Sequence, residues 1–420
     1  MSSLEIRNIG CLATPRGTAA RRGAAQGEIQ RVRGAAVRAE NGRITFVGPE
    51  AEYERRFGRQ PAAVSIDASG QTAIPGLVDA HTHPVWVGDR GEEIARRLAG
   101  ESYASIAEQG GGILSTVRAT RAASDEQLAG ATRKRLARML ATGTTTIEAK
   151  SGYGLTVDSE LRALRLLASL SESPDSVPRI VPTLLAAHEV PPEFTSRRDR
   201  WISIITEEIL PQTANQRLAR FCDVFCDRGA FTVEESRTIL ESARRLGLGL
   251  RIHADELVLS GGARLAAELR AESADHLLRI GPEEIDALSR SGTVATLAPG
   301  TAWWIRSRQA PARALMEAGV PVAIASDSNP GTCHTESLAS VAAHACLDAG
   351  MTVDETLTAI TLNGAASLGL ASEIGSLEIG KHADVVLLDA PDDRHLIYHW
   401  GVNLVAAVVK GGRLIEGLQS

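Results

Sequence analysis

The sequence predicts an α/β protein: a (β/α)₈ barrel of the TIM type, with a small β-sandwich domain built from both chain ends. Three observations support this fold class: eight short apolar runs, helical patterns between several of them, and strand-like segments near the two ends of the 420-residue chain. Apolar runs that alternate with helical periodicity are typical of βα units around a parallel sheet. Eight such strands over about 250 residues favour a closed barrel.

The apolar runs are each short enough for a buried strand. They span residues 77–83, 144–149, 179–185, 223–226, 248–254, 273–277, 293–299 and 322–327. Residues 125–142 lie between the first two runs. In this segment the apolar residues Leu128, Leu136, Met139 and Leu140 recur at helical spacing. We therefore expect parallel strands separated by amphipathic helices.

The chain ends have a different pattern. Residues 42–48 and 63–67 predict short strands, and so do residues 381–388 and 405–415, with a turn at Gly411 and Gly412. Each end is too small to fold alone, so we expect the two to pair. The predicted division is a β-sandwich domain from residues 1–73 and 373–420, and a barrel domain from residues 74–372.

Composition excludes several classes of protein. The 45 basic and 51 acidic residues give a net charge of −6, which argues against a nucleic-acid surface. The basic stretch at residues 16–33 is rich in Gly and Ala and is interpreted as a solvated loop. No apolar run reaches the length of a membrane span, and the first residues lack a signal-peptide pattern, so we expect a cytoplasmic protein with no membrane partner. Five scattered cysteines predict no disulfide framework.

Polar residues gather where the predicted strands end. His81 and His83 close the first run, and residues two apart on a strand share a face, so this pair can provide half of a metal's ligands. Taken alone, the pattern equally fits a polar strand end. Later runs are closed or followed by further polar residues: Lys150, His188, His253, His276 and Asp327. A barrel brings all of these to one rim, and such convergence predicts a metal site.

Several longer motifs carry a resemblance to a known family. They are Pro-Gly-Leu-Val-Asp-Ala-His-Thr-His at 75–83, Gly-Gly-Gly-Ile-Leu-Ser-Thr-Val-Arg-Ala-Thr at 110–120, Glu-Ala-Lys-Ser-Gly-Tyr-Gly at 148–154, Ile-His-Ala-Asp-Glu at 252–256, Ser-Ala-Asp-His at 273–276 and Ser-Asp-Ser-Asn-Pro-Gly at 326–331. The chain resembles the amidohydrolase superfamily and, within it, the imidazolonepropionase family. Ser328, where an aromatic is expected, and the pair Trp303 and Trp304 depart from the family pattern and bear on substrate fit.

The resemblance implies a barrel of the amidohydrolase type that holds one divalent transition metal, Zn or Fe. The implied ligands are His81, His83, His253 and Asp327. Independently, three imidazoles and a carboxylate suit Zn²⁺ or Fe²⁺ better than Mg²⁺ or Ca²⁺. Related two-metal hydrolases carry a bridging lysine at the end of the fourth strand. This chain has Cys226-Asp227 there, so one metal is the better interpretation, and Lys150 is interpreted as an orienting residue or an ion-pair partner.

The activity that the resemblance implies belongs to histidine degradation. It is the hydrolysis of the cyclic C–N bond of 4-imidazolone-5-propanoate to N-formimidoyl-L-glutamate. A metal-activated water attacks the ring carbonyl, which requires a proton shuttle and an electrophilic helper. We assign these roles to Glu256 and His276. The structural alternatives are a helix-capping carboxylate for Glu256 and a hydrogen-bonded core imidazole for His276.

Substrate contacts are also predicted. Arg90 can bind the propionate carboxylate through two N–H groups of its charged guanidinium. The alternative is that Arg90 is a solvated surface arginine. The resemblance further implies contacts from Tyr103, Tyr153, His188, Glu256, Asn329, Gly331 and Thr332. The predicted partner is a small-molecule substrate, with no nucleic acid, and the resemblance implies a homodimer.

Two other functions remain open on the sequence. One is a deaminase of the same superfamily acting on a guanine- or cytosine-like ring, which would release ammonia. The other is a barrel kept as a non-catalytic scaffold, whose mark would be a missing ligand. All four predicted ligands and the predicted shuttle are present in this sequence.

Overall fold

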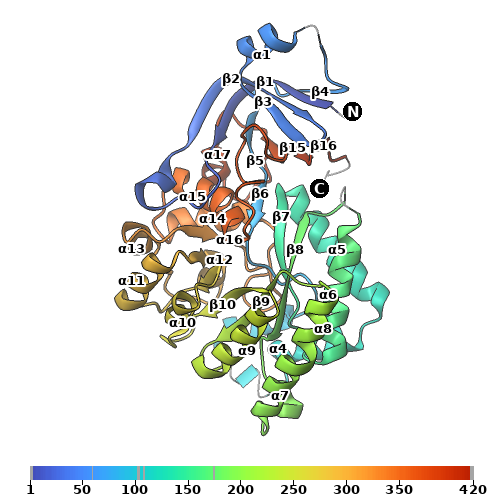
Figure 1. Cartoon of the computed structure of the whole chain (residues 1–420), viewed down its shortest axis with the longest axis vertical. Coiled ribbons are helices and arrows are strands. Elements are labelled where there is room, and N and C mark those ends of the chain that lie inside the picture. The colour runs from blue at the N-terminus through green and yellow to red at the C-terminus, as the bar shows by residue number, and fades with distance from the viewer. Residues whose placement is uncertain (1–2, 59, 102–104, 107–108, 174–175, 417–420) are drawn as a thin grey trace.

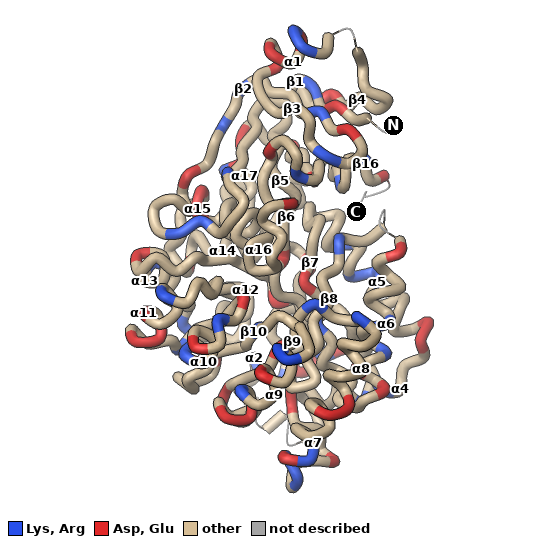
Figure 2. The backbone as a smooth tube through the Cα atoms, in the orientation of Figure 1, with Lys and Arg blue, Asp and Glu red and all other residues tan. Residues whose placement is uncertain are grey.

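The computed structural model describes residues 3–58, 60–101, 105–106, 109–173 and 176–416. Its two parts are a twisted β-sheet, drawn at the top of Figure 1, and a helix-covered barrel below it. Both ends of the described chain belong to the sheet, and the middle of the chain forms the barrel. Basic and acidic residues are interspersed along the described backbone (Figure 2), in keeping with the near balance of charges.

The barrel consists of eight parallel strands, one for each predicted apolar run. In chain order they are β6 (Leu77–Asp79), β7 (Thr144–Lys150), β8 (Arg179–Ala187), β9 (Phe221–Cys226), β10 (Gly249–Ala254), β11 (Ser273–His276), β12 (Val294–Leu297) and β13 (Val322–Ile324). Each strand pairs with the next in sequence, so spatial order follows chain order. The predicted (β/α)₈ barrel is therefore confirmed.

The ring closes just beyond the ends of the first and last strands. The Asp327 N–H donates to the His81 carbonyl at 3.0 Å, and the His83 N–H donates to the Ser328 carbonyl at 3.0 Å. One residue pair deeper, the Ser326 N–H donates to the Asp79 carboxylate at 2.9 Å. Closure thus places the two histidines directly beside Asp327.

Helices surround the strands (Figure 1). Those of the barrel and its loops are α2 (Gly91–Leu98), α4 (Ile113–Ala122), α5 (Asp125–Ala141), α6 (Val157–Ser171), α7 (Arg198–Ile204), α8 (Leu210–Asn215), α9 (Val233–Arg245), α10 (Gly262–Glu268), α11 (Pro282–Ser291), α12 (Pro299–Trp304), α13 (Ala312–Glu317), α14 (Leu338–Leu347), α15 (Val353–Ala359) and α16 (Leu362–Ser367). The helix predicted at residues 125–142 is α5. It starts at a capping box in which Ser124 and Gln127 exchange side-chain to backbone hydrogen bonds.

The β domain is one continuous mixed sheet in the order β16-β15-β14-β5-β1-β2-β3, with β4 paired to β1. The strands are β1 (Ser3–Thr14), β2 (Gln30–Glu40), β3 (Arg43–Pro49), β4 (Val64–Asp67), β5 (Thr72–Pro75), β14 (Val385–Leu388), β15 (Val405–Lys410) and β16 (Arg413–Leu414). Helix α1 (Glu50–Phe57) follows β3, and α17 (His395–Tyr398) lies between β14 and β15. The pairing of β5 with both β1 and β14 joins the two chain ends, as predicted.

For the basic stretch at residues 16–33 the prediction of a solvated loop holds only in part: residues 16–22 lie outside helices and strands, and Arg16 and Arg22 are exposed. Gly23–Gly27 forms a short 3₁₀ helix in which Gln26 is fully buried, and β2 begins at Gln30. Arg31 is half-buried, and its guanidinium pairs with Asp354 and with Asp393, more than 300 residues away in sequence. Acidic partners so distant leave no local signal.

The exact domain limits stay a prediction. Strand β5 ends at Pro75 and belongs to the sheet, whereas β6 starts the barrel at Leu77. Within the described part of the chain, no helix combines the length and apolar character that a membrane crossing requires.

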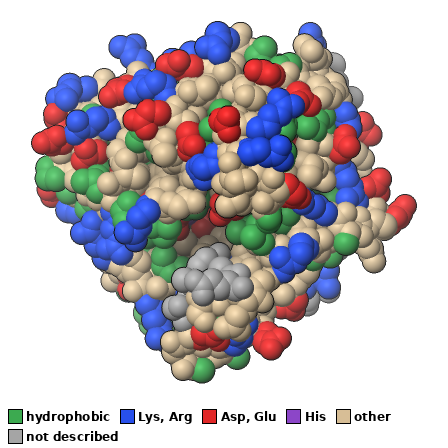
Figure 3. Space-filling model, turned by 90° about the horizontal axis from the view of Figure 1, so that it is seen from below, with side chains coloured by type: hydrophobic (Ala, Val, Ile, Leu, Met, Phe, Trp, Pro, Cys, Tyr) green, Lys and Arg blue, Asp and Glu red, His purple; other side chains and the backbone are tan. Residues whose placement is uncertain are grey.

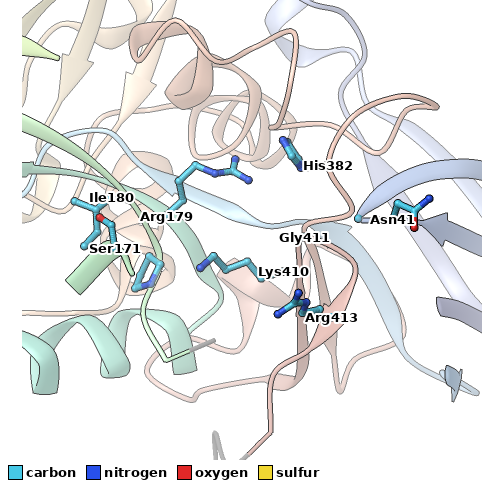
Figure 4. A pocket seen from close by; sticks show the side chains of 10 residues that line it. Asn41, Ser171, Arg179, Ile180, His382, Lys410, Gly411 and Arg413 are labelled. Atoms are coloured by element: carbon cyan, nitrogen blue, oxygen red, sulfur yellow. The ribbon is translucent and has the colours of Figure 1, made fainter. Parts of the chain in front are cut away.

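A cavity of about 440 Å³ lies between the sheet and the barrel, far along the strands from their carboxyl ends. Figure 4 shows Arg179 and Ser171 on one side of it and Asn41 on the other. Its cations have partners: Arg179 lies 3.6 Å from the Asp384 carboxylate, and Lys410 donates to the Val177 carbonyl at 2.7 Å. None of the predicted site residues that the structure describes lines it.

Candidate metal centre and substrate cavity

Three predicted ligands converge at the carboxyl ends of the strands. His81 Nε2 lies 3.2 Å from His83 Nε2. Asp327 Oδ1 lies 3.5 Å from His81 Nε2 and 3.3 Å from His83 Nε2. All three residues are at most 3% exposed. One atom from each residue therefore faces a common buried point.

The fourth predicted ligand, His253, lies nearer to His81 than to His83. The ring of His253 lies 4.4 Å from that of His81, centre to centre, and 5.4 Å from that of His83. Among the described residues, ligand atoms within 4.8 Å of one another form one group of His81, His83 and Asp327, and another of His81, His253 and His276. The structure thus brings the four predicted ligands together in two overlapping groups.

A partner behind three of the four ligands fixes their orientation, whereas His83 Nδ1 has no hydrogen-bond partner among the described residues. His81 Nδ1 lies 2.6 Å from the Asp275 carboxylate, and His253 Nδ1 lies 3.0 Å from the Asp223 carboxylate. The Thr301 hydroxyl donates to Asp327 Oδ2 at 2.6 Å, so Oδ1 remains for the centre. Such carboxylate–histidine pairs are typical of metal sites, where they fix the tautomer of the ligating ring. The sequence predicted neither Asp223 nor Asp275 as functional.

The protonation states of His81, His83 and Asp327 suit a cation. Burial lowers the pKa of His83 to about 4 and that of His81 well below its usual value, so both rings are neutral at pH 7. Burial opposes ionisation of Asp327, but hydrogen bonding to His83 and to Thr301 holds its pKa below the ordinary range. Two ring lone pairs and a carboxylate oxygen thus meet within 3.5 Å, an arrangement that a divalent metal would stabilise.

The centre opens into a cavity of about 590 Å³. Seven of the predicted substrate contacts line it together with His83, His253, His276 and Asp327; they are Arg90, Tyr153, His188, Glu256, Asn329, Gly331 and Thr332. Tyr103 lies outside the described residues. The face opposite the β domain is hollowed near its centre, with basic side chains close to the hollow (Figure 3).

Hydrogen bonds from the backbone around Glu256 to Asp227 hold Glu256 in the cavity wall. The N–H groups of Glu256 and Leu257 both donate to the Asp227 carboxylate at 2.8 Å. Burial raises the pKa of the Glu256 carboxyl, and its Oε1 lies 3.9 Å from His276 Nδ1. The capping alternative is wrong, because Asp255 accepts the N–H groups before α10, and α10 has no side-chain cap.

His276 has a strained and unpaired position. Its φ is 72°, in the left-handed region, and neither ring nitrogen is hydrogen bonded to a described residue. The ring is 2% exposed and lies 5.1 Å from both His81 and His253, centre to centre. The alternative of a hydrogen-bonded core histidine is therefore wrong.

Arg90 is buried rather than solvated, with a side chain only 7% exposed. Its Nε and Nη2 bind Glu93 at 2.9 and 2.8 Å. A Cβ added at Gly331 would lie 2.3 Å from Arg90 Nη1, so the missing side chain of Gly331 leaves the space that the guanidinium fills. This excludes the surface-arginine alternative and gives Gly331 a physical role.

Tyr153 and His188 also line the cavity. The His188 ring stacks on His83 at 5.1 Å, and its Nδ1 lies 3.0 Å from the Gly152 carbonyl. Glu160, fully buried on α6, accepts the N–H groups of Gly152, Gly154 and Leu155 and so fixes the loop that carries Tyr153.

Several lining residues were missed by the sequence analysis. They are Arg97, Glu189, Phe225 and Arg228, among others. Glu189 and Arg228 each follow a predicted strand end by a few residues, so their position was a usable signal. Arg97 lies on α2, where the sequence pattern carries no such signal.

Comparison with known proteins places the chain. Residues 72–415 match the model of the amidohydrolase family. An imidazolonepropionase from Symbiobacterium thermophilum is 47% identical over 94% of this chain and 93% of the relative. Those from Shouchella clausii (46%, covering 92% and 87%) and Parabacteroides distasonis (45%, covering 98% and 99%) are similarly close.

Solved structures with lower identity share the fold. An adenosine deaminase from Xanthomonas campestris with bound zinc superposes with a TM-score of 0.75 at 22% identity, covering 98% of this chain and 92% of the other. A triazine hydrolase variant gives 0.72 at 17% identity, covering 98% and 94%. At this identity the likeness concerns the fold alone. On the family match and the 45–47% identity over nearly its whole length, the chain belongs to the amidohydrolase family and, within it, to the imidazolonepropionases.

Proposed function

We propose that this hydrolase opens the ring of 4-imidazolone-5-propanoate to give N-formimidoyl-L-glutamate, a step of histidine degradation. The observation that carries the proposal is that one cavity holds a buried histidine–aspartate centre, a carboxyl of raised pKa at Glu256 and the arginine Arg90. These are the three elements that hydrolysis of a cyclic amide bearing a carboxylate requires. The 45–47% identity to imidazolonepropionases supports it.

The proposed metal ligands are His81, His83, His253 and Asp327, for one divalent ion, Zn or Fe. When bound, such an ion supplies Lewis acidity and lowers the pKa of a water molecule toward neutrality. The donor set fits this role, since the ligand imidazoles that face it are neutral or oriented by carboxylates.

The side chains around the centre perform the remaining steps. Glu256 accepts a proton as the water oxygen bonds to the ring carbonyl carbon. It then delivers the proton to the ring nitrogen as the C–N bond breaks. His276, whose ring nitrogens have no partner among the described residues, stabilises the carbonyl oxygen as negative charge develops on it.

The rest of the cavity binds and orients the substrate. Arg90 binds the propionate, and Tyr153 and His188 contact the ring. Asn329 accepts the N–H groups of Gly331 and Thr332, both at 2.8 Å, which orders the loop that these three residues share beside Arg90.

The deaminase alternative is less well supported. A guanine- or cytosine-like ring has no carboxylate for Arg90, and the solved deaminase shares only the fold with this chain. The scaffold alternative would leave a ligand missing, whereas all four predicted ligands lie together at the rim.

The proposal is tested by an ultraviolet assay of imidazolonepropionate disappearance, with metal analysis of the same preparation. We expect consumption of the substrate and N-formimidoylglutamate as the product by mass spectrometry. Release of ammonia from guanine or cytosine, with no consumption of imidazolonepropionate, would establish the deaminase instead.

The resemblance further supports a cytoplasmic homodimer. Cell fractionation tests the location. Light scattering on the eluting protein tests the oligomeric state, and a mass of one chain would exclude the dimer.

A further inference from the structure

A buried ammonium group lies directly behind the metal centre. Lys150 ends β7 and is completely buried. Its Nζ lies 2.6 Å from Asp223 Oδ2, 2.7 Å from Glu148 Oε1 and 3.9 Å from Asp275 Oδ2. Carboxylates from three strands, β7, β9 and β11, therefore surround a single positive charge.

Two of these carboxylates are shared with the metal centre. Asp223 faces His253, and Asp275 faces His81, through the same Oδ2 atoms that face Lys150. His81, Asp223 and Asp275 also form a group whose potential ligand atoms all lie within 4.8 Å of one another. The geometry is that of a cation site in which a lysine side chain supplies the cation.

The charge balance depends on this lysine. The other cation is Arg251, 3.4 Å from Asp275 and 3.7 Å from Glu148, and its Nη atoms also donate to the carbonyls of Ser367 and Ala80. Asp275 Oδ1 is buried and accepts no hydrogen bond from the described residues. Without Lys150, three buried carboxylates would face one guanidinium, and an unpaired buried charge is strongly unfavourable.

We propose that Lys150 is a built-in counter-ion that keeps the centre mononuclear, and that its removal opens a second divalent-cation site formed by Glu148, Asp223 and Asp275. Carboxylate oxygens favour a hard ion such as Mn²⁺. The inference rests on the proposed metal centre, and the wild-type protein in the same experiment tests that centre separately.

The experiment measures metal stoichiometry rather than activity. Wild type and Lys150→Ala are stripped with chelator and reloaded with Mn²⁺. After gel filtration, bound manganese is measured by mass spectrometry. We expect one ion per chain in wild type and two in Lys150→Ala.

Two further variants serve as controls. Lys381→Ala removes another buried lysine, whose Nζ donates to the carbonyls of Gly17 and Ala371 at 2.6 Å, and it should keep one ion. Glu148→Gln combined with Lys150→Ala removes a ligand of the new site that touches no proposed metal ligand, and it should return the count to one.

Each possible metal count either supports or overturns the inference. One ion in Lys150→Ala would overturn the inference, because the protein would then have compensated the lost charge in another way. Two ions in wild type would overturn it too, whereas a wild-type protein that binds neither Mn²⁺ nor Zn²⁺ after reloading would contradict the proposed centre itself. If Lys150→Ala is unfolded, refolding with and without Mn²⁺ decides: recovery only with Mn²⁺ and two bound ions supports the inference, and no recovery overturns it.

Discussion

The rim of the barrel and the core of the β domain are equally buried but opposite in chemistry. In the β domain, Ile6, Val37 and Val385 are fully buried among other apolar side chains. At the rim, His81, Asp275 and Lys150 are buried to the same degree but consist of charged or polar groups. Apolar burial stabilises a fold directly, whereas each buried polar group must find a partner. The rim is therefore held together by hydrogen-bonded and ion-paired side chains, and the β domain by the packing of apolar side chains.

The backbone differs in the same way. Ten of the described non-glycine residues have positive φ, and five of them lie at the rim, at the end of a barrel strand or in the loop that follows one: Leu155, Asp255, His276, Leu277 and Asp327. The β domain has Asn8 and Asn41, a residue type that tolerates this conformation. Strained residues persist where the surroundings hold them in place, and such places are often functional sites.

Removing a proposed metal ligand should have the largest effect. We expect Asp327→Ala or His253→Ala to lose the metal and to lower kcat/KM by at least about 10³-fold, since both Lewis acidity and the activated water would be lost. Metal content and turnover are measured on the same preparation. A variant that keeps both its metal and its activity would remove that residue from the ligand set.

Glu256→Gln comes next. Glutamine keeps the shape and hydrogen-bonding capacity of the side chain but cannot accept a proton at neutral pH. We expect kcat to fall by about 10² to 10⁴-fold, with little change in KM or in metal content. Glu189→Gln, in the wall of the same cavity, is the control and should be much milder. If Glu256→Gln keeps most of its kcat, His276 becomes the leading candidate for the shuttle.

How much of the barrel rim and of the β domain the sequence predicts depends on whether the residues that form each feature are close together in the sequence. The eight strands were predicted because an apolar run of a few residues is a local pattern. The two longest strands of the β domain were missed, since β1 has a register shift between Ile6 and Ile9, around Asn8, that interrupts its alternation. The proposed ligands were recognised from motifs that resemble a known family.

The partners of those ligands were not recognised. Lys150 was interpreted as an orienting residue or an ion-pair partner, but its partner Asp223 lies 73 residues away, and only the closed barrel brings the two together. The same holds for the pairing of Arg90 with the space at Gly331, since a missing side chain has no signature in the sequence. Long-range pairs are thus what the sequence could not give.

A substitution in the β domain tests whether the two regions are independent. Ile6→Ala removes a fully buried side chain, and large-to-small changes in a core typically cost about 2–5 kcal/mol of stability. We expect about 3 kcal/mol in urea unfolding, with metal content and KM unchanged. Loss of metal from the folded variant would show that the rim depends on the sheet.

Asp79→Asn tests how much the buried carboxyl of Asp79, at the point where the barrel closes, lowers the free energy of unfolding when it ionises. Burial raises the pKa of Asp79 from 3.8 to about 7. The folded state therefore binds more protons than the unfolded state between these values, so stability is present at low pH and falls as pH rises through this window. Asparagine can still accept the Ser326 N–H but carries no charge.

The comparison uses urea unfolding of metal-free protein at about pH 5 and about pH 7. Since one pKa unit corresponds to about 1.4 kcal/mol, wild type should lose about 2 kcal/mol relative to Asp79→Asn over this range. Parallel pH profiles for the two proteins would show that Asp79 is already ionised when folded.

Gly331→Ala should have the smallest effect and the most specific one. The new Cβ would overlap Arg90 Nη1, the end of a flexible side chain that can move aside without unfolding the protein. We expect KM to rise about tenfold with kcat and Tm nearly unchanged, because only a charge-assisted contact to the substrate is displaced. Gly130→Ala, where an added Cβ meets no atom within 4 Å, is the control and should leave KM unchanged. If Gly331 acts through Arg90, then adding Gly331→Ala to Arg90→Ala should change KM no further, and full additivity of the two effects would assign Gly331 an independent contact with the substrate.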